Sequence, residues 1–239
     1  MPTGKAIAIL GAKGGVGTTT IAANLAAEFA ANPDQSVVLV DLNLFLGDVG
    51  LHTGIESGPT VLTVIASDSA PDASALARHP LGFSVLGLAS DLSDADEVPA
   101  EAVVWLLDSL RSQFDCVVVD AGTDLNEVSL TACRYADDRL LVTTEQRSAL
   151  IGAKRRLHVL SQLEIPGTVA LGVINRAHAD SGVNPAAVHQ AIGLTVIARI
   201  RNAWADNQAA LTAKKLLREH CPTANVTHDY TQITRHVRY

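Results

Sequence analysis

A glycine-rich loop between an apolar run and an alanine-rich segment carries the clearest chemical signal in this sequence. It reads Lys13-Gly14-Gly15-Val16-Gly17-Thr18-Thr19-Thr20. Glycines let successive backbone N–H groups converge on one point and leave no Cβ in the way of phosphate oxygens. A helix that follows such a loop adds unpaired N–H groups and the positive end of its dipole. We therefore predict that the loop binds a triphosphate, with the Thr19 hydroxyl on Mg²⁺.

The loop departs from the strict phosphate-loop pattern G-x-x-x-x-G-K-[ST] at two positions. Ala12 stands in place of the first glycine, and Thr18 stands in place of the lysine. The alternative is a glycine-rich strand-to-helix turn that binds nothing. Three glycines, a lysine and three threonines would be an unusual composition for a mere turn, so we favour phosphate binding.

Two aspartates, Asp41 and Asp120, each end a strand-like apolar run. The carboxyl ends of parallel strands meet at one edge of a sheet, where the ligands of open α/β sheets bind. An aspartate after a strand often only caps the next turn. Two of them beside a glycine loop instead predict a Mg²⁺ site, with Asp120 acting through water and Thr19 completing the set of ligands.

The segments that must position these residues alternate between strand and helix along the whole chain. Apolar runs predict strands at 5–10, 37–42, 83–88, 116–119, 140–144, 169–174 and 195–200. Helical patterns cover residues 18–31, 101–110, 148–163, 184–193 and 207–219. Such alternation predicts a doubly wound α/β fold of the P-loop NTPase type, a mostly parallel sheet with helices on both faces.

Composition favours one globular domain over residues 1–239. Hydrophobic residues make up 48% and charged residues 18%, enough apolar surface for one large core. We find no internal repeat or interdomain linker, and residues 67–75 read as a surface loop or ragged helix inside the domain. We therefore predict a single nucleotide-binding domain.

Cysteine usage and charge indicate the setting of the protein. The three cysteines, Cys116, Cys133 and Cys221, show no CxxC pair, which favours a reducing compartment. No secretory signal or transmembrane run is evident, so we predict a cytoplasmic protein. The net charge is −7, although residues 199–239 carry seven Lys/Arg against three Asp/Glu. Because the net charge is negative, we expect no specific nucleic-acid partner.

The loop and its acids together resemble the ParA/MinD family of deviant Walker A ATPases. The extra lysine early in the loop, the hallmark of that family, corresponds to Lys13. Asp41-Leu42-Asn43 falls where the family has its first switch, and Asp120-Ala121-Gly122 where it has the second. Asn175-Arg176 resembles the site of the family's adenine-contacting Asn.

The resemblance implies an ATP–Mg²⁺ sandwich homodimer in which Lys13 reaches the phosphates bound by the partner subunit. The alternative for this residue is a solvated lysine that contacts nothing. Asn43 stands where the family has the acid that positions the attacking water, and Thr18 replaces the lysine that reaches the β/γ-phosphates. Losing one preorganised charge costs roughly 10²–10³ in rate, so we predict slow or negligible hydrolysis. Lys13, Asp41 and Asn43 remain the candidate catalytic residues.

Within the family, Thr18 and the runs at 41–49 and 114–120 look like CpaE/TadZ proteins, localisation factors of tight-adherence (Flp) pilus assembly. That branch commonly has a receiver-like domain before the core, and none is evident in these residues. The branch predicts protein partners in a secretion or pilus machine, recruitment to a pole or to the inner face of the membrane, and membrane contact only through partners. The alternatives are a competent ParA/MinD-type ATPase that positions DNA or a septum complex, and a scaffold that no longer binds nucleotide.

Basic clusters elsewhere admit a functional and a structural interpretation. The segment 207–219 carries Lys214, Lys215 and Arg218, and either meets an acidic partner or is an ordinary surface helix, which we favour. The tail 227–239 has too little apolar face to predict a membrane helix. Lys154-Arg155-Arg156 is most simply solvated, and the eight histidines show no metal-ligand spacing.

Overall fold

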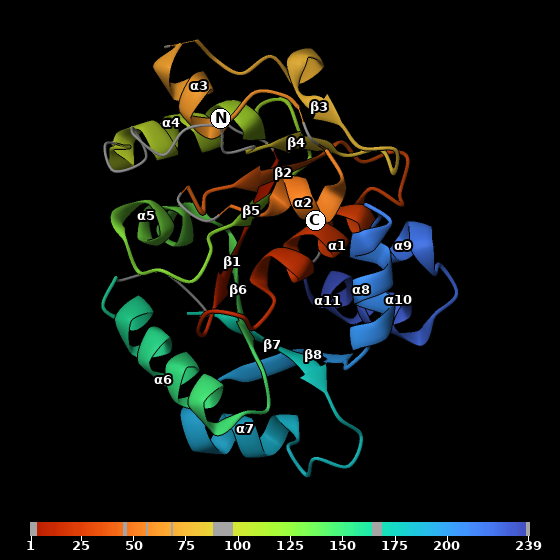
Figure 1. Cartoon of the computed structure of the whole chain (residues 1–239). Coiled ribbons are helices and arrows are strands. Elements are labelled where there is room, and N and C mark those ends of the chain that lie inside the picture. The colour runs from red at the N-terminus through yellow and green to blue at the C-terminus, as the bar shows by residue number, and fades with distance from the viewer. Residues whose placement is uncertain are drawn as a thin grey trace.

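Among the residues that the structure describes, eight strands form one sheet in the order β3-β4-β2-β5-β1-β6-β7-β8, with only β3 antiparallel to its neighbour (Figure 1). The computed structural model describes residues 4–44, 47–55, 57–67, 69–87, 98–163 and 169–237. The strands are β1 (Lys5–Gly11), β2 (Val37–Asp41), β3 (Ala77–Arg78), β4 (Ser84–Leu86), β5 (Cys116–Asp120), β6 (Asp138–Thr143), β7 (Leu171–Ala177) and β8 (Thr195–Arg201). The central strands are buried on both sides, which explains their continuous apolar sequences.

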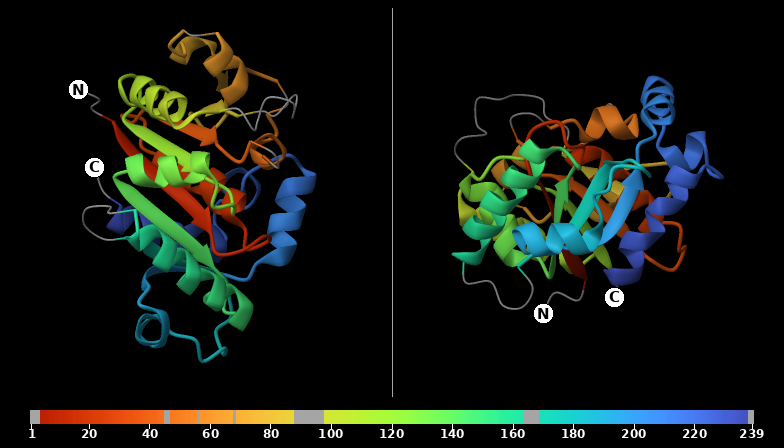
Figure 2. Two further views of the ribbon diagram at one scale, coloured as in Figure 1. Left: turned by 90° about the vertical axis from the view of Figure 1, so that its left-hand side faces the viewer. Right: turned by 90° about the horizontal axis from the view of Figure 1, so that it is seen from below.

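Helices cover both faces of this sheet (Figure 2). One face packs against α3 (Val61–Ala66), α4 (Ala100–Arg111), α5 (Glu127–Tyr135), α6 (Arg147–Ser161) and α7 (Pro185–Ile192). The other packs against α1 (Thr18–Phe29), α2 (Val49–Thr53), α8 (Trp204–Thr212), α9 (Leu217–His220), α10 (Asn225–Asp229) and α11 (Thr231–His236). Side chains of β1 alternate between the two cores, since Ala8 and Leu10 join one while Ile7 and Ile9 join the other.

The predicted fold class is confirmed, and most predicted elements lie within a few residues of their observed bounds. Residues 67–75 hold only a 3₁₀ turn, Ala73–Ala75, in their described part. The sequence pattern gave no indication of α2, α3 or β3, whereas Cys133, read from the sequence as part of a helical stretch, does lie in α5. Within the described residues, no helix is both long enough and apolar enough to span a bilayer.

One prediction about the C-terminal region was wrong. Residues 207–219 do not form one helix, because Lys214 adopts a left-handed conformation (φ 53°) and separates α8 from α9. The few apolar residues of the tail, for which no role was predicted, pack into the domain. Tyr230, Ile233 and Val237 lie at helical spacing and are buried in the core that α1 shares with β8. The described part of the tail is therefore part of the fold.

Candidate nucleotide-binding site

The glycine loop connects the end of β1 to the first residue of α1, as predicted. Gly17 has φ 91°, a left-handed conformation that disfavours any residue with a Cβ. A Cβ on Gly17 would also overlap the amide nitrogen of Asn175. At Gly14 and Gly15, by contrast, a Cβ would meet only open space. The loop is thus held closely at its base and leaves an open cradle at its tip.

The start of α1 offers backbone donors to this cradle. Its N-cap residue, Gly17, has no side chain to bond the first N–H groups, and the N–H of Ile21 is the one that bonds Gly17 O, at 2.9 Å. The preceding N–H groups of the first turn are those that bind anions at helix N-termini. The Thr18 hydroxyl, in contrast, lies buried against Gly11 and has no hydrogen-bond partner in the described structure.

Asp41 and Asp120 stand side by side, since they pair in the register of β2 with β5. Both do cap the turns after their strands: Oδ1 of Asp41 accepts from Asn43 N–H, and Oδ1 of Asp120 accepts from Gly122 N–H, each at 3.0 Å. Oδ2 of Asp41 also accepts from Val49 N–H at 3.3 Å. Oδ2 of Asp120 has no partner among the described residues although it is fully buried. Capping therefore leaves one carboxylate oxygen without a bond.

The electrostatics of this pair favour a bound cation. Burial raises the pKa of Asp41 well above its ordinary value, and the neighbouring carboxylate of Asp120 raises it further. Burial also raises the pKa of Asp120, although the nearby Thr19 side chain and the Gly122 N–H oppose this. The exposed Asp48 acts on both acids in the same direction as burial. A divalent cation would favour the charged carboxylates that burial disfavours.

Asn43 and Lys13 also lie at this edge. The side chain of Asn43 rests against the backbone of Gly122, so the segments that follow β2 and β5 touch. The ammonium of Lys13 donates to Gln146 Oε1 at 3.3 Å and to Ser148 Oγ at 3.2 Å, both at the start of α6. Lys13 therefore has partners within its own chain, and the solvated-lysine alternative does not describe this structure.

A pocket of about 240 Å³ opens next to the loop. Three residues predicted to bind the nucleotide, Thr20, Asn175 and Arg176, line it. Most of the other lining residues come from the end of β8 at Arg201 and from the segment that follows it, through α8 to Leu217. Loop and pocket are thus contiguous, and both lie at the carboxyl edge of the parallel strands.

Asn175 joins the loop to the pocket. Its Nδ2 donates to Val16 O at 2.8 Å, and its Oδ1 accepts from Arg176 N–H at 2.9 Å. An amide has two donor hydrogens and two acceptor lone pairs, so one of each remains for a ligand. Arg176 adopts φ 54°, an uncommon conformation for a residue with a side chain, at the irregularity in the pairing of β7 with β8 between Ile174 and Ala177.

Comparison with known proteins agrees with this geometry. A family model described as an AAA domain (AAA_31) matches residues 4–166. The septum site-determining protein MinD of Synechocystis is 30% identical over 172 residues, 71% of this chain and 64% of that protein. The chain belongs to the ParA/MinD family.

Solved structures of this family share the fold. A ParA family ATPase from Chlorobium tepidum superposes with a TM-score of 0.90 at 21% identity, over 98% of this chain and 99% of that one. A MinD from Pyrococcus horikoshii in complex with Mg-ADP gives a TM-score of 0.83 at 20% identity, over 98% and 95%. The chain spans 64–66% of the length of the first curated relatives it matches.

Several residues of this candidate site were not predicted from the sequence. His52 of α2 contacts Thr20 Oγ1 through Nε2 at 3.1 Å and Asp48 O through Nδ1 at 3.0 Å. Asn24 donates to Thr20 O at 2.9 Å and accepts from Leu217 N–H at 3.1 Å, which ties α1 to α9. The pocket wall at residues 202–217 could have been suspected, because it directly follows a strand end at the ligand edge of the sheet.

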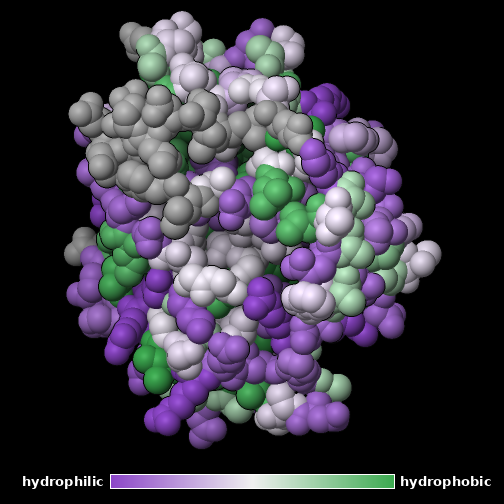
Figure 3. Space-filling view, viewed as in Figure 1, coloured by the Kyte–Doolittle hydropathy of each residue, from purple (hydrophilic) through white to green (hydrophobic). Residues whose placement is uncertain are grey.

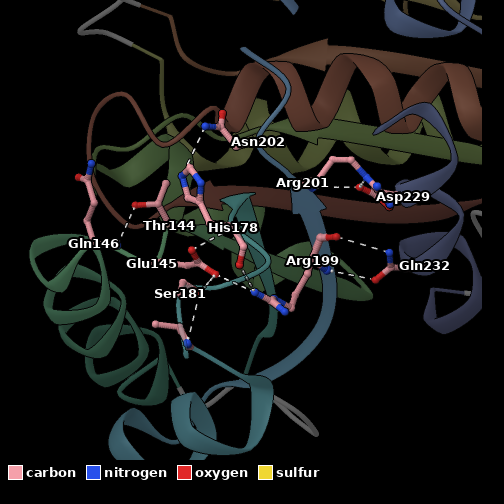
Figure 4. Close-up of polar contacts among 11 residues, drawn as sticks. Thr144, Glu145, Gln146, His178, Ser181, Arg199, Arg201, Asn202, Asp229 and Gln232 are labelled. Carbon is pink, nitrogen blue, oxygen red and sulfur yellow. Dashed lines mark hydrogen bonds and ion pairs between the residues drawn. The ribbon is translucent and has the colours of Figure 1, made fainter. Parts of the chain in front are cut away.

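A polar network holds this wall in place (Figure 4). Glu145 accepts from Arg199 at 2.8 Å and from the Ser181 hydroxyl at 2.7 Å, so β8 is tied to the segment after β7. Arg201 makes a bidentate ion pair with Asp229 at 2.8 and 2.9 Å. These contacts come from four segments and position the pocket side of β8 before any ligand binds.

The residues present fit a Mg²⁺–nucleotide. Mg²⁺ is usually held by one or two carboxylates together with waters and phosphate oxygens, rather than by a cage of protein ligands. In the described part of the chain, no cluster of three His, Cys, Asp or Glu side chains could hold a metal alone. The unbonded Oδ2 of Asp120 and the nearby Thr19 hydroxyl match the partial protein set that a Mg²⁺–phosphate needs.

Proposed function

We propose that the protein is a cytoplasmic, ATP-dependent dimerisation switch that binds Mg²⁺–ATP and turns it over slowly. The observation that carries this proposal is the contrast inside the loop. The cradle at Gly14 and Gly15 is open, and a buried carboxylate oxygen of Asp120 has no partner. Yet the residue in the lysine position, Thr18, directs its hydroxyl to Gly11 beneath the loop.

Each group has a role in this proposal. The loop and the first turn of α1 hold the phosphates, and Asp120, Asp41 and Thr19 hold Mg²⁺ directly or through water. Magnesium supplies charge neutralisation at the phosphates. Asn43 orients water by its amide, which weakens hydrolysis because an amide accepts no proton from that water. Asn175 and Arg176 border the nucleoside.

Binding and turnover are tested separately. Thermal unfolding with Mg²⁺–ATP at 100 times its Kd should show about 2.7 kcal/mol of stabilisation, and its absence at millimolar ATP would favour a scaffold without nucleotide. Steady-state ATP hydrolysis should be far below the roughly 1–10³ s⁻¹ of typical enzymes. Thr18→Lys, which returns an ammonium to the loop, should raise turnover by about 10²–10³. Ordinary wild-type turnover would contradict the slow switch.

Dimerisation depends on Lys13 in this proposal. To reach a partner subunit, Lys13 must break its hydrogen bonds to Gln146 and Ser148. Both of these side chains are neutral, so breaking the bonds leaves no buried charge without a partner. Light scattering of the protein with no nucleotide, ADP or ATP should show a dimer with ATP alone. Lys13→Ala should bind ATP but stay monomeric, whereas Lys154→Ala, an exposed lysine on α6, should dimerise normally. A Lys13→Ala dimer would exclude the trans-acting lysine.

We further propose that the switch recruits components of a pilus machine, as CpaE/TadZ proteins do, with Thr18 and the residues that follow β2 as the supporting sequence. A deletion strain should lose surface pili, and wild type but not Lys13→Ala should restore them. MinD similarity keeps a competent DNA- or membrane-positioning ATPase as the alternative. Co-sedimentation with DNA and with liposomes, each with and without ATP, distinguishes the two, because strong ATP-dependent binding to either supports the alternative.

A further inference from the structure

Trp204 is the most exposed of the large hydrophobic side chains in the described structure, at 67%. It is the first residue of α8 and lines the same pocket as Asn175 and Arg176. The chain has only two tryptophans and an aromatic content of 4%. Covering a large indole that stands mostly exposed at the rim of a pocket would be favourable, because it removes apolar surface from water.

The backbone that carries Trp204 is anchored on both sides. The N–H of Asn202 donates to Ala177 O at 2.9 Å, which ties the end of β8 to β7. The side chain of Asn207 donates to Ala203 O at 2.9 Å and closes the first turn of α8. The ion pair of Arg201 with Asp229 fixes the strand just before this turn (Figure 4). Because the backbone is anchored, binding of a flat ligand would order only the indole side chain.

The pocket has room for part of a nucleotide. Its volume of about 240 Å³ is below the roughly 300–1,000 Å³ of sites that enclose whole ligands. The phosphate loop lies next to it at Thr20, so the pocket need hold only the sugar and base. The polar groups around it, among them Asn175, Asn207 and Gln208, suit a heterocycle edge.

We propose that Trp204 stacks on the base of the bound nucleotide and so makes the site prefer a nucleoside triphosphate to inorganic triphosphate. The proposal rests on the proposed function, since it names the group that recognises the base at that same site. Stacking on an aromatic face favours any base, so Trp204 supplies affinity for the ring, and discrimination among bases is left to the amides.

A protein partner is the competing explanation for an exposed tryptophan. On the face shown in Figure 3, hydrophobic residues are scattered among polar ones rather than gathered in one patch. The other exposed large hydrophobic side chains of the described chain, Leu51, Leu125 and Ile151, do not line the pocket. Trp204 borders a cavity whose walls combine apolar side chains with the amides of Asn175, Asn207 and Gln208, which fits a small heterocycle better than a flat protein surface.

Two single-tryptophan variants test the proposal. Trp105→Phe removes the half-buried tryptophan of α4 and leaves Trp204 as the only indole. Trp204→Phe leaves Trp105 as the only one. Mg²⁺–ATP should quench or shift the emission of Trp105→Phe and leave that of Trp204→Phe unchanged. Inorganic tripolyphosphate with Mg²⁺ should leave both unchanged, since it fills the loop without a base.

Affinity gives an independent readout by calorimetry on the same proteins. Trp204→Ala should weaken ATP binding about tenfold, while Trp204→Phe, which can still stack, should retain most of it. Tripolyphosphate affinity should be the same in all variants. The proposal is overturned if wild type binds ATP with no response from Trp204 and Trp204→Ala binds as tightly as wild type. If wild type binds neither ATP nor tripolyphosphate, both the proposed function and this inference are wrong. If wild type binds ATP and tripolyphosphate with equal affinity, only this inference is wrong.

Discussion

The two halves of the candidate site are built in opposite ways. The phosphate half comes from residues at strand ends and in one short loop, and its main acids, Asp41 and Asp120, are buried. The nucleoside half comes from the ends of β7 and β8 and from α8 and α9. Its largest exposed side chain, that of Trp204, is mostly accessible to solvent. Backbone conformation determines the first half, whereas packing between distant segments determines the second.

This difference predicts how each half responds to change. The phosphate loop depends on its backbone conformation and has no room for a Cβ at Gly17. A substitution there should therefore remove phosphate binding as a whole rather than weaken one contact. A wall assembled from side chains should lose affinity in smaller steps, because each contact contributes part of the binding free energy. The structure also shows where the halves meet, at Asn175, Asn24 and His52.

The largest effect should come from Gly17→Ala in the phosphate half. The left-handed φ of 91° and the overlap of a Cβ with the Asn175 amide should together destabilise the protein by about 2 kcal/mol or more and abolish ATP binding at millimolar concentration. Gly14→Ala is the matched control, because its Cβ meets open space and its ligand-free stability should change by less than about 0.5 kcal/mol. Urea unfolding and calorimetry measure both. Equal stability of the two variants would contradict the constraint at Gly17.

Asp120→Asn should separate folding from metal binding within the same half. Because burial raises the pKa of Asp120, the charged form is unfavourable in the fold at pH 7.5, and a neutral amide should raise the melting temperature of the ligand-free protein. The Mg²⁺-dependent part of ATP affinity should fall about 10–100-fold. Thermal unfolding with and without Mg²⁺–ATP tests this, with the exposed Asp34→Asn as control. A lower melting temperature for the free variant would show that the carboxylate stabilises the fold.

The same division explains what the sequence could predict. Glycines in a strand-to-helix loop and acids at strand ends are local features, so Gly17, Asp41 and Asp120 were found from residue type and spacing. In the nucleoside half, Asn175 and Arg176 were named from the family resemblance, but no residue of the wall at 202–217 was named for this site from residue type and spacing. Its break at Lys214 falls in a run without glycine or proline, and just after the break the N–H of Leu217 bonds Asn24, 193 residues away in the sequence. Local pattern cannot show such a contact.

Asn24→Ala tests the joint between the halves. The variant removes the acceptor of the buried Leu217 N–H and the donor to Thr20 O, and an unpaired buried N–H costs about 1–3 kcal/mol. We expect the free energy of unfolding, measured in urea, to fall by that amount. The affinity for ATP should decrease more than the affinity for tripolyphosphate, because the pocket wall loosens more than the loop. Asn32→Ala, at an exposed position, is the control. An equal decrease for both ligands would mean that the joint supports the loop instead.

The smallest effect concerns His79, which links α2 to α9 behind the pocket. It is buried, stacks on Phe83 with ring centroids 4.5 Å apart, and lies 3.5 Å from Glu219. Burial lowers the pKa of His79, although Glu219 and the Thr53 backbone oppose this. Its Nδ1 accepts from Leu81 N–H at 3.1 Å, which requires that nitrogen to carry no proton.

The sign of the pH effect follows from this lowered pKa. Just below the ordinary value of about 6.5, the unfolded chain binds more protons at this site than the folded one, so stability falls as pH falls through that range, by at most about 1.4 kcal/mol per pH unit. His79→Phe keeps the stacking position and removes the titration. The difference in unfolding free energy between pH 7.5 and 5.5 should therefore be smaller in the variant than in wild type, whatever the absolute stability of each. An unchanged difference would show that protonation of His79 does not loosen the link between α2 and α9, and that this side of the nucleoside half is insensitive to pH.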